Sequence, residues 1–414
     1  MFIAKYMSKT EQGYYYTFAS IVAIQIFFEL GLSNIITQFT AHEVAFLKWT
    51  NSNNTLDGDP QALSRISHLL KFCIRWYSII SLALIFVLIF FGFYYFNKYS
   101  KNEIIEWQNP WLMLCISTSL NLLISPILAF LEGLGLVRDI AKIRLLQQSV
   151  QIFVLISLFF CGFGLMASPI TSLIVFLIAP ITILLSDKYK ILLNIWNFKG
   201  IYKIDYFKEI FPFQWKIALS WISGYFIFQL FNPIIFATSG PIAAGQMGMT
   251  LGALNGILTI SLSWINTRVP FFSKFIARKE YDQLDIFFIS TIKSSSIACA
   301  FMLICFSILL FFIKNIKNPY SERFLSFKLI LILSFCTFLV QIIYALATYL
   351  RCHKKEPYLI HSIITAIVTA LSTICFAKYY GVNGVIYSYG IITLVLSFPW
   401  ALKIFYNKKS QWQI

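Results

Sequence analysis

The chain has 414 residues, of which 58% are hydrophobic, 18% aromatic and only 12% charged. So few charged residues cannot cover a soluble globular protein of this length, and the composition therefore predicts a polytopic membrane protein. A formal net charge of +16 would suggest nucleic acid as the partner of a soluble domain. Here the basic residues lie in short loops between apolar runs, as they do in the cytosolic loops of membrane proteins, so we expect no nucleic-acid partner.

Apolar runs of about 20 residues, the length that a helix needs to cross a bilayer, follow one another along the chain. We place about eleven membrane-spanning helices at 13–38, 72–96, 110–131, 146–166, 168–186, 215–238, 242–266, 286–312, 327–350, 357–378 and 384–405. When the loops are assigned alternately to the two faces of the membrane, most Lys and Arg fall on one face. The C-terminus is therefore predicted to lie in the cytosol and the N-terminus outside. A chain that starts outside without a signal peptide suggests that a first helix is missing, with MFIAKY as its last turn.

Glu29, in FFELGL, is the most deeply placed carboxylate within a predicted span. An ionisable group at such a depth costs about 3 kcal/mol on insertion scales, so it needs a partner or water. One interpretation is a proton or sodium site that couples transport to an ion gradient. The other is a structural ion pair with Arg75 or Arg268.

The segment 187–214 alternates Lys with Ile, Leu, Trp, Phe and Tyr, which is typical of a basic amphipathic segment on the inner surface of a membrane. It divides the chain roughly in half. We therefore expect an N-terminal lobe at 1–186 with about five spans, a cytosolic linker at 187–214 and a C-terminal lobe at 215–414 with six spans.

The first part of the stretch from Gly240 to Asp285 has the length of a span. It nevertheless carries many small and polar side chains: Gln246, Thr250, Asn255, Thr259, Ser261, Ser263 and Asn266. Such side chains belong against protein or water rather than lipid. The stretch therefore predicts a helix that lines a cavity, ends at Arg268 and Pro270, and continues into a cytosolic amphipathic helix.

Two alignments of the chain with itself indicate an internal repeat. At an offset of 232 residues Gly13 falls on Gly245 and Phe39 on Phe271, and at an offset of 219 Leu131 falls on Leu350. Repeats related by an axis along the membrane normal are typical of two-lobed transporters. We therefore predict an all-α fold with two pseudo-symmetric helical lobes, built on a twelve-helix plan that lacks most of the first helix.

Three runs of the chain resemble a known family. The first run is SKTEQGYYYTFASIVAIQIFFELGL, in which a short loop ends in Gly-Tyr before a span that closes on Leu-Gly. The second run is LEGLGLVRDIAKIRLLQQ, which is similar to the segment after the family's fourth span. The third is a late Tyr-Gly-x-x-Gly turn at Tyr380, Gly381 and Gly384. These runs resemble polysaccharide and O-antigen flippases of the multidrug/oligosaccharidyl-lipid/polysaccharide exporter superfamily. The resemblance implies movement of undecaprenyl-pyrophosphate-linked sugar repeats from the inner to the outer leaflet of the bacterial inner membrane, for O-antigen, capsule or exopolysaccharide synthesis. It also implies alternating access, a lipid-linked oligosaccharide as partner together with membrane lipids, and a polymerase and glycosyltransferases as possible further partners.

Moving a pyrophosphate through the membrane requires cationic groups in a water-filled cavity between lobes. Arg75, Lys216 and Arg268 lie at the predicted cytosolic ends of spans and are our candidates, with Asn255 and Gln229 as sugar-binding amides. Basic residues at span ends also snorkel to headgroups, so this alternative stays open. Glu132 and Arg351 occupy adjacent positions in the two repeats, and we predict for them either an ion pair between the lobes or solvated loop charges.

No motif of an enzyme active site is present, and neither the eight cysteines nor the four histidines show metal-ligand spacing. We therefore predict neither enzyme activity nor a metal or cofactor beyond a coupling H⁺ or Na⁺. A multidrug or cation antiporter of the same superfamily remains an alternative, although it should carry more acidic residues within the membrane. A membrane glycosyltransferase or polymerase is a second alternative, but it would need a larger extracytoplasmic loop.

Overall fold

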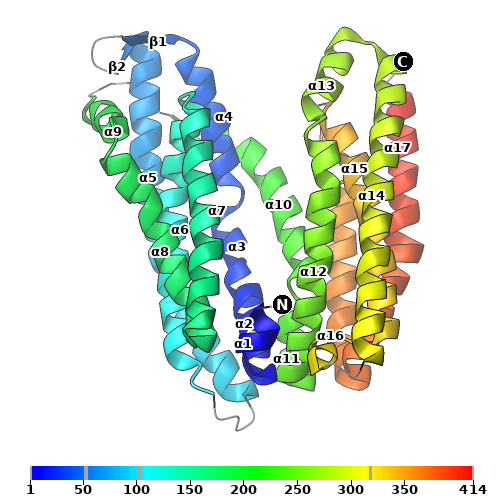
Figure 1. The fold of residues 1–414 in the computed structure, drawn as a ribbon. Coiled ribbons are helices and arrows are strands. Elements are labelled where there is room, and N and C mark those ends of the chain that lie inside the picture. Colours follow the sequence, from blue (N-terminus) through cyan, green and yellow to red (C-terminus); the bar gives the residue numbers. More distant parts are fainter. Residues whose placement is uncertain are drawn as a thin grey trace. The chain divides into compact units, whose positions relative to one another are not determined.

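The computed structural model describes residues 2–50, 55–100, 105–198, 200, 202, 204–316, 319–353 and 355–412, and these are almost entirely helical (Figure 1). One antiparallel hairpin, β1 (Leu47–Thr50) with β2 (Thr55–Gly58), is paired in the register Leu47 to Gly58. Among the described residues, nine helices are long and apolar enough to cross a membrane, and a bent pair, Lys9–Glu29 with Leu32–Val44, adds a tenth. The chain is therefore a multi-pass membrane protein, and the predicted all-α fold class is confirmed.

The last apolar segment accounts for the eleventh predicted span. Leu359–Trp412 combines α16 (Leu359–Ile391), a π-helical turn at Ile392–Ser397 and α17 (Phe398–Trp412). At a rise of 1.5 Å per residue it would extend about 80 Å as one straight helix, far beyond the roughly 30 Å of a hydrocarbon core. Non-helical torsion angles at Gly381 (φ 56°, ψ −143°) interrupt it within the Tyr-Gly-x-x-Gly motif. All eleven predicted runs thus fall on helical segments, although 13–38, 146–166, 215–238 and 384–405 each extend across a break between described helices.

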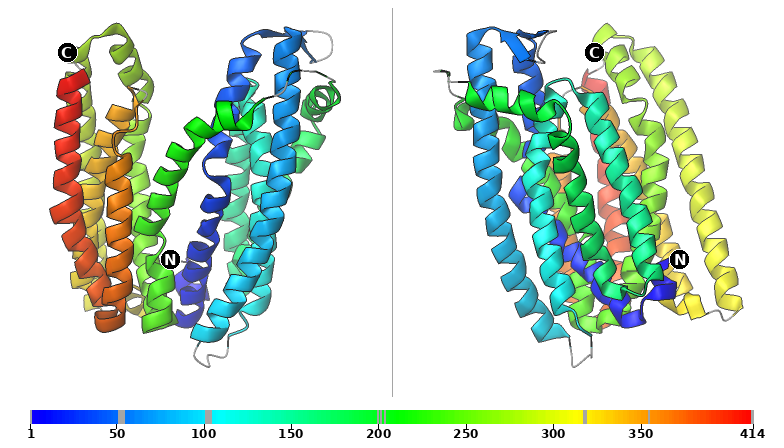
Figure 2. Two further views of the ribbon diagram at one scale, coloured as in Figure 1. Left: turned by 180° about the vertical axis from the view of Figure 1, so that it is seen from behind. Right: turned by 60° about the vertical axis from the view of Figure 1, so that its left-hand side comes forward.

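The chain folds into two compact units, and unit 1 consists of Met1–Met7 and Ile21–Ile222. Its helices are α1 (Phe2–Tyr6), α3 (Ile26–Glu29), α4 (Leu32–Val44), α5 (Pro60–Tyr99), α6 (Gln108–Gly133), α7 (Val137–Phe160), α8 (Ala167–Leu184), α9 (Lys188–Asn197) and the first part of α10 (Phe211–Phe228). Within it α6 packs against α4, α5 and α8 (Figure 2). The ring of Trp111 lies so close to Gly92 that α5 and α6 could not approach in this way with any larger residue there.

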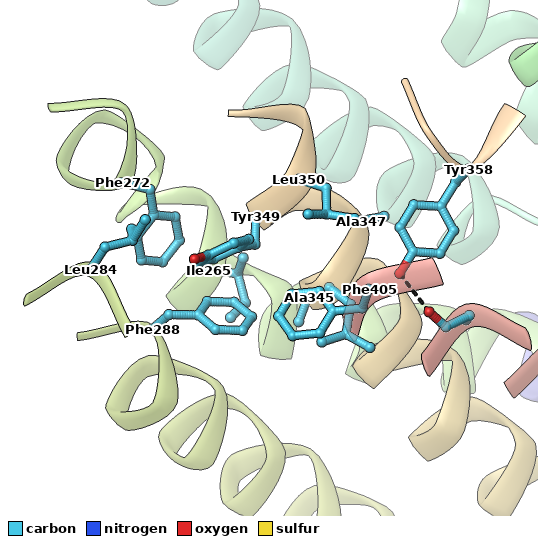
Figure 3. Close-up of a cluster of buried hydrophobic side chains, with 12 residues drawn as sticks. Ile265, Phe272, Leu284, Phe288, Ala345, Ala347, Tyr349, Leu350, Tyr358 and Phe405 are labelled. Carbon is cyan, nitrogen blue, oxygen red and sulfur yellow. Dashed lines mark hydrogen bonds between the residues drawn. The ribbon is translucent and has the colours of Figure 1, made fainter. Parts of the chain in front are cut away.

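Unit 2 consists of Ser8–Ser20 and Ser223–Ile414. Its helices are most of α2 (Lys9–Val22), α11 (Phe231–Ser239), α12 (Pro241–Asn266), α13 (Val269–Arg278), α14 (Tyr281–Asn315), α15 (Phe327–Arg351), α16 and α17. α12 contacts α11, α14 and α15. A cluster of buried aromatic and aliphatic side chains, centred on Tyr349, Phe272, Phe288 and Phe405, joins α13, α14, α15 and α17 (Figure 3). The hydroxyl of Tyr358 donates to the Ala401 carbonyl at 2.9 Å, which satisfies the polar atom at the edge of this cluster.

These units differ from the predicted division in two places. Residues 8–20 belong to unit 2, and the predicted linker 187–214 belongs to unit 1 together with residues 215–222, which were expected in the C-terminal lobe. Residues 199, 201 and 203 of the linker lie outside the described part. In α9, Ile191 and Ile195 are buried, and the helix contacts α5. The hydroxyl of Ser67 donates to the Phe198 carbonyl at 3.1 Å. Ile191 and Ile195 therefore cover protein, whereas Leu193, Tyr202 and Phe207 of the same segment are exposed.

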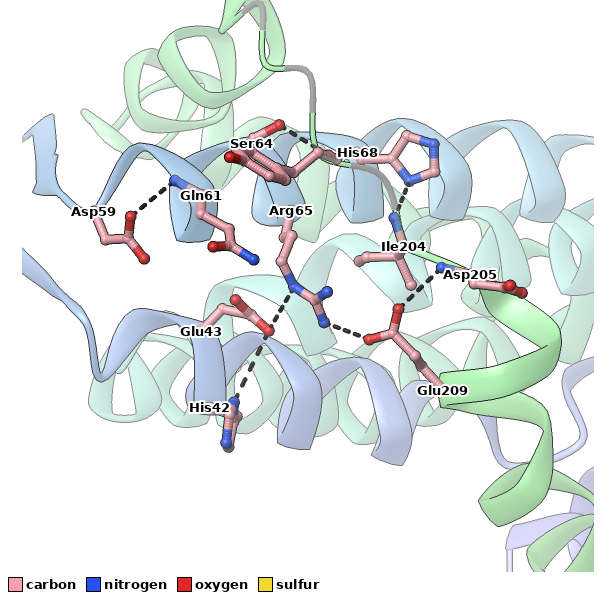
Figure 4. Close-up of polar contacts among 11 residues, drawn as sticks. His42, Glu43, Asp59, Gln61, Ser64, Arg65, His68, Ile204, Asp205 and Glu209 are labelled. Atoms are coloured by element: carbon pink, nitrogen blue, oxygen red, sulfur yellow. Dashed lines mark hydrogen bonds and ion pairs between the residues drawn. The ribbon is translucent and has the colours of Figure 1, made fainter.

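A half-buried arginine, Arg65, joins the end of this linker to the rest of unit 1 (Figure 4). Arg65 on α5 donates from Nε to Glu43 of α4 at 3.0 Å, and its Nη2 donates to Glu209 just before α10. Partial burial alone would raise the pKa of the Glu209 carboxyl, but Arg65 and the amide of Asp205 outweigh this effect and hold the pKa below its ordinary value. The contact is therefore present at neutral pH and is lost only as the pH falls through that lowered value.

The helix boundaries bear on the internal repeat. Moving α6 forward by 219 residues places it at 327–352, where α15 occupies Phe327–Arg351. The same shift places α5 at 279–318, and α14 occupies Tyr281–Asn315. The two units therefore share an order of equivalent helices, as the sequence alignment at this offset predicts.

Candidate functional site

The two ends of α12 have different surroundings, which explains the mixed character of its sequence. In the first half, Gly245 and Gly248 pack against α2 so closely that a Cβ at Gly248 would lie 2.3 Å from Tyr16 Cβ. Gln246 donates to the Glu322 carbonyl at 2.8 Å, and buried Thr250 accepts from the amide of Leu325 at 3.3 Å. This half is a packing surface within unit 2.

The second half exposes a row of polar side chains. They recur every three or four residues on one face of the helix, and we call them the α12 polar stripe: Asn255, Thr259, Ser263, Asn266 and Thr267. On the opposite face Leu254 and Ile265 are buried. The exposed amides of Asn255 and Asn266 require water or a polar ligand, because hydrocarbon does not satisfy them.

The hydroxyls of the stripe already have hydrogen-bond acceptors within the helix. Thr259 donates to the Asn255 carbonyl at 2.8 Å, and Ser263 donates to the Ile260 carbonyl at 2.6 Å. Their oxygens can still accept hydrogen bonds, and the amide groups of asparagine can both donate and accept. This combination matches the hydroxyl groups of a sugar.

Ser261 belongs to a different network, although the sequence places it among the stripe residues. It is fully buried, and its carbonyl accepts from Ser295 of α14 at 2.7 Å. Gln341 of α15 in turn donates to the Ser295 hydroxyl at 2.8 Å. Ser295 and Gln341 are polar residues that sequence reasoning missed, because composition does not reveal which face of a span is buried.

Arg268 stands at the end of the stripe, between α12 and α13. Its side chain is exposed, and its guanidinium carbon lies 5.1 Å from the centre of the Phe287 ring. None of the salt bridges among the described residues involves it. At 1.5 Å per residue, the distance along the axis from Asn255 to Arg268 is about 20 Å. Arg268 is thus an uncompensated cation at one end of a neutral polar surface.

Glu29 lies at a break between helices in unit 1. Leu30 and Gly31, which separate α3 from α4, both have left-handed torsion angles (φ 50° and 69°). Ser33 donates to the Glu29 carboxylate at 2.5 Å. The same hydroxyl lies 3.3 Å from the Tyr77 hydroxyl and 2.9 Å from that of Ser125.

This arrangement gives Glu29 hydroxyl groups as neighbours, in place of the arginine partner that one interpretation expected. Glu29 and Ser33 are four residues apart, but the left-handed residues between them break the helix, so no helical spacing in the sequence indicates this contact. α10 covers the break, since a Cβ at Gly31 would lie 2.5 Å from Ile217 Cγ2. The Glu29 carboxylate thus accepts from one hydroxyl, that of Ser33, which in turn contacts the hydroxyls of Tyr77 and Ser125.

The remaining predicted residues are divided between the units. Lys216 is exposed on α10 in unit 1, 5.7 Å from the centre of the Trp215 ring, and Gln229 follows α10 in unit 2 and is half-buried. Arg75 is exposed on α5 on the face that also exposes Ile79, Leu82 and Phe86. Asn255 and Arg268 both lie in unit 2 and are exposed, Asn255 in the second half of α12 and Arg268 just after its end.

Glu132 and Arg351 each have a partner in their own unit. Arg144 Nη2 donates to Glu132 at 2.7 Å, and the guanidinium of Arg351 donates from Nε and Nη2 to Glu356 at 2.8–3.1 Å. An ion pair between the lobes would require both residues to exchange these partners. It stays a prediction.

The chain matches no protein-family profile and no curated protein sequence. Its structure is similar to that of an inward-facing multidrug resistance MATE family transporter of the MOP superfamily, with a TM-score of 0.63 and 13% identity over 97% of this chain and 94% of the other. It is also similar to the lipid II flippase MurJ in an inward closed conformation (TM-score 0.57, 15% identity, 99% and 86% covered). A MOP superfamily transporter from Pyrococcus furiosus gives a TM-score of 0.56 at 12% identity, with 100% and 91% covered. The chain therefore has the fold of MOP superfamily transporters.

Proposed function

We propose that this protein flips undecaprenyl-pyrophosphate-linked oligosaccharides from the cytoplasmic to the periplasmic leaflet of the bacterial inner membrane, by alternating access. The observation that carries the proposal is the α12 polar stripe with unpaired Arg268 at its end. A neutral surface of amides and hydroxyls about 20 Å long suits several sugar units. A free guanidinium at its end suits the pyrophosphate. In this proposal the C-terminus and the Arg268 end of α12 lie on the cytosolic side.

The alternative is a multidrug or cation antiporter with the same fold. Such a protein needs carboxylates on its substrate surface to attract cations. The stripe from Asn255 to Thr267 contains none, and the nearest charge on the same surface is the positive charge of Arg268. This charge distribution favours an anionic, sugar-bearing substrate, and the product would then serve polymerases and glycosyltransferases of surface polysaccharide synthesis.

The stripe provides the test of this function. In a strain that depends on this gene, the triple substitution Asn255→Leu, Thr259→Val, Ser263→Ala should reduce surface polysaccharide at least tenfold. Lipid-linked repeats should accumulate on the cytosolic face. The measurement compares the total amount of extracted lipid-linked repeats with the fraction that a label added to the outer leaflet can reach. The matched control is Thr182→Val with Ser307→Ala, whose hydroxyls also donate to the backbone one turn earlier in their helices, and it should leave the polysaccharide unchanged. Loss of drug resistance without accumulation of lipid-linked repeats would overturn the flippase in favour of the antiporter.

We further propose that Glu29 couples transport to a proton or sodium gradient. Glu29→Gln keeps the shape and the hydrogen bond to Ser33 but removes the ionisable group. In membrane vesicles with an imposed ion gradient, the variant should still bind substrate and should lose most of its gradient-stimulated flipping, about tenfold or more. Stimulation equal to that of the wild type in the variant would refute the coupling role and leave Glu29 as a structural residue.

A further inference from the structure

Lys293 lies on the most exposed apolar face of α14. The neighbours of Lys293 on this face are Ile286, Ile297 and Phe301, which are 72%, 70% and 67% exposed. With Lys293 they stand at positions 286, 293, 297 and 301, so that two helical turns separate the first pair and about one turn each of the following pairs. A face of large, exposed apolar side chains on a membrane-spanning helix is a surface for lipid.

The position of Lys293 is within this face rather than at its end. The exposed apolar residues continue from Ile286 to Ile308, which corresponds to about 33 Å of helix and so to the thickness of a hydrocarbon core. Lys293 lies about 10 Å from the Ile286 end. An ammonium group at this place requires an anion or the headgroup region to stabilise its charge.

The protein itself supplies no such anion among its described residues. Lys293 is exposed, and none of the salt bridges of unit 2 includes it. Ser290, one turn earlier, and Ser294, the next residue, are also exposed. The hydroxyl of Ser294 donates to the Ser290 carbonyl at 3.1 Å. The polar groups on this face are therefore hydrogen-bond donors and hydroxyl oxygens without a carboxylate.

The equivalent helix of unit 1 carries a cation at the equivalent place. Moving Arg75 forward by 219 residues places it at 294, next to Lys293. Arg75 shares its face of α5 with Ile79, Leu82 and Phe86, all exposed. Two equivalent helices thus each carry one cation on a lipid-facing surface. The unequal distribution of Lys and Arg between the loops of the two membrane faces does not account for this pattern, because both residues lie within helices.

We propose that Lys293, with the hydroxyl of Ser290, binds the phosphate of an anionic bilayer phospholipid, and that Arg75 does the same on unit 1. Charge complementarity and surroundings select this ligand, because the acyl chains would lie along Ile297 and Phe301 while the phosphate meets the ammonium. Anionic lipids are the abundant anions at the membrane surface. The site is separate from the α12 polar stripe, and the proposal does not depend on the proposed substrate.

Native mass spectrometry of the full-length protein tests the site. Phosphatidylglycerol is titrated into wild type, Lys293→Gln, Lys293→Arg and Lys314→Gln, and the last of these removes an exposed lysine near the other end of the same helix. One lysine near anionic lipid contributes about 1 kcal/mol, so Lys293→Gln should weaken phosphatidylglycerol binding about fivefold. Lys293→Arg and Lys314→Gln should bind it as the wild type does. Arg75→Gln should reduce binding by a similar factor, independently of Lys293→Gln.

Two results would overturn the proposal. In the first, Lys293→Gln binds phosphatidylglycerol as tightly as wild type does, or loses no more affinity than Lys314→Gln loses. Lys293 would then have no special role among the lysines of α14. In the second, Lys293→Gln weakens binding of a prenyl diphosphate probe and leaves phosphatidylglycerol binding intact, which would assign this surface to a lipid-linked substrate instead. Failure of the probe to bind wild type at all would count against the proposed transport function and would leave the phospholipid site standing.

Discussion

Substitution of Gly13 by alanine is expected to destabilise the protein by roughly 2–3 kcal/mol or more. A Cβ at this position would lie 2.0 Å from the Pro241 carbonyl oxygen and 2.5 Å from its carbon. These are backbone atoms at the start of α12, so no side-chain rotation relieves the overlap, and the two helices must separate. Gln12, whose amide donates to the Gly245 carbonyl at 2.8 Å, would lose its buried partner as they do so. Thermal unfolding of the purified protein in detergent measures the effect.

Gly256→Ala is the matched control for this experiment. Gly256 also lies inside α12, but a Cβ there would meet nothing within 4 Å. Alanine is the better helix former by about 1 kcal/mol, so this variant should be as stable as wild type or slightly more stable. If Gly13→Ala melted at the wild-type temperature, the close contact between α2 and α12 would not exist in the folded protein.

The second large effect is expected at Arg268. Replacement by glutamine removes the positive charge that we propose for the pyrophosphate, and a charge-assisted hydrogen bond to phosphate contributes about 1.5–3 kcal/mol. Flipping of the lipid-linked substrate in reconstituted vesicles should therefore fall by roughly ten- to a hundredfold. Arg268→Lys, which keeps the charge and loses the planar fork, should retain intermediate activity.

The control for Arg268 is Arg278→Gln at the other end of α13. Arg278 is also exposed, but it stands near Glu280 at 3.9 Å, outside the α12 polar stripe. The Arg278→Gln variant should flip the lipid-linked substrate at the wild-type rate. Equal losses in the two variants would indicate a general effect of positive charge at this end of unit 2 and would remove Arg268 from the site.

The helices themselves could be predicted from the sequence because a bilayer imposes one length and one composition on every span. The eleven apolar runs, the equivalence of α6 and α15, and the interruption near Gly381 follow from apolarity, spacing and a glycine motif. The polar character of α12 could also be read, and its second half exposes polar side chains as expected. That these side chains line a cavity stays a prediction. These features depend on the helix and the membrane alone.

What the sequence does not reveal is which neighbour each helix face meets. Thr250 and Ser261 look like Thr259 and Ser263 in the sequence, yet the first two are buried and the last two exposed. The basic, aromatic linker has the composition of a membrane-surface segment, but Arg65 and the carboxylates that flank it hold its end to unit 1. Such contacts join residues far apart in the chain, and no local pattern encodes them.

The boundaries between the units have a mechanical consequence. Apart from the turn at Met7 and Ser8, the chain passes from one unit to the other inside helices, within α2 after Ser20 and within α10 after Ile222. A continuous helix is stiffer than a loop of the same length. Helices bend at glycine–serine pairs and at short 3-10 segments. The pair Ser223–Gly224 lies directly after Ile222 in α10, and the 3-10 turn at Ala23–Gln25 lies a few residues after Ser20. Any bend at these places would therefore lie within a helix that belongs to both units.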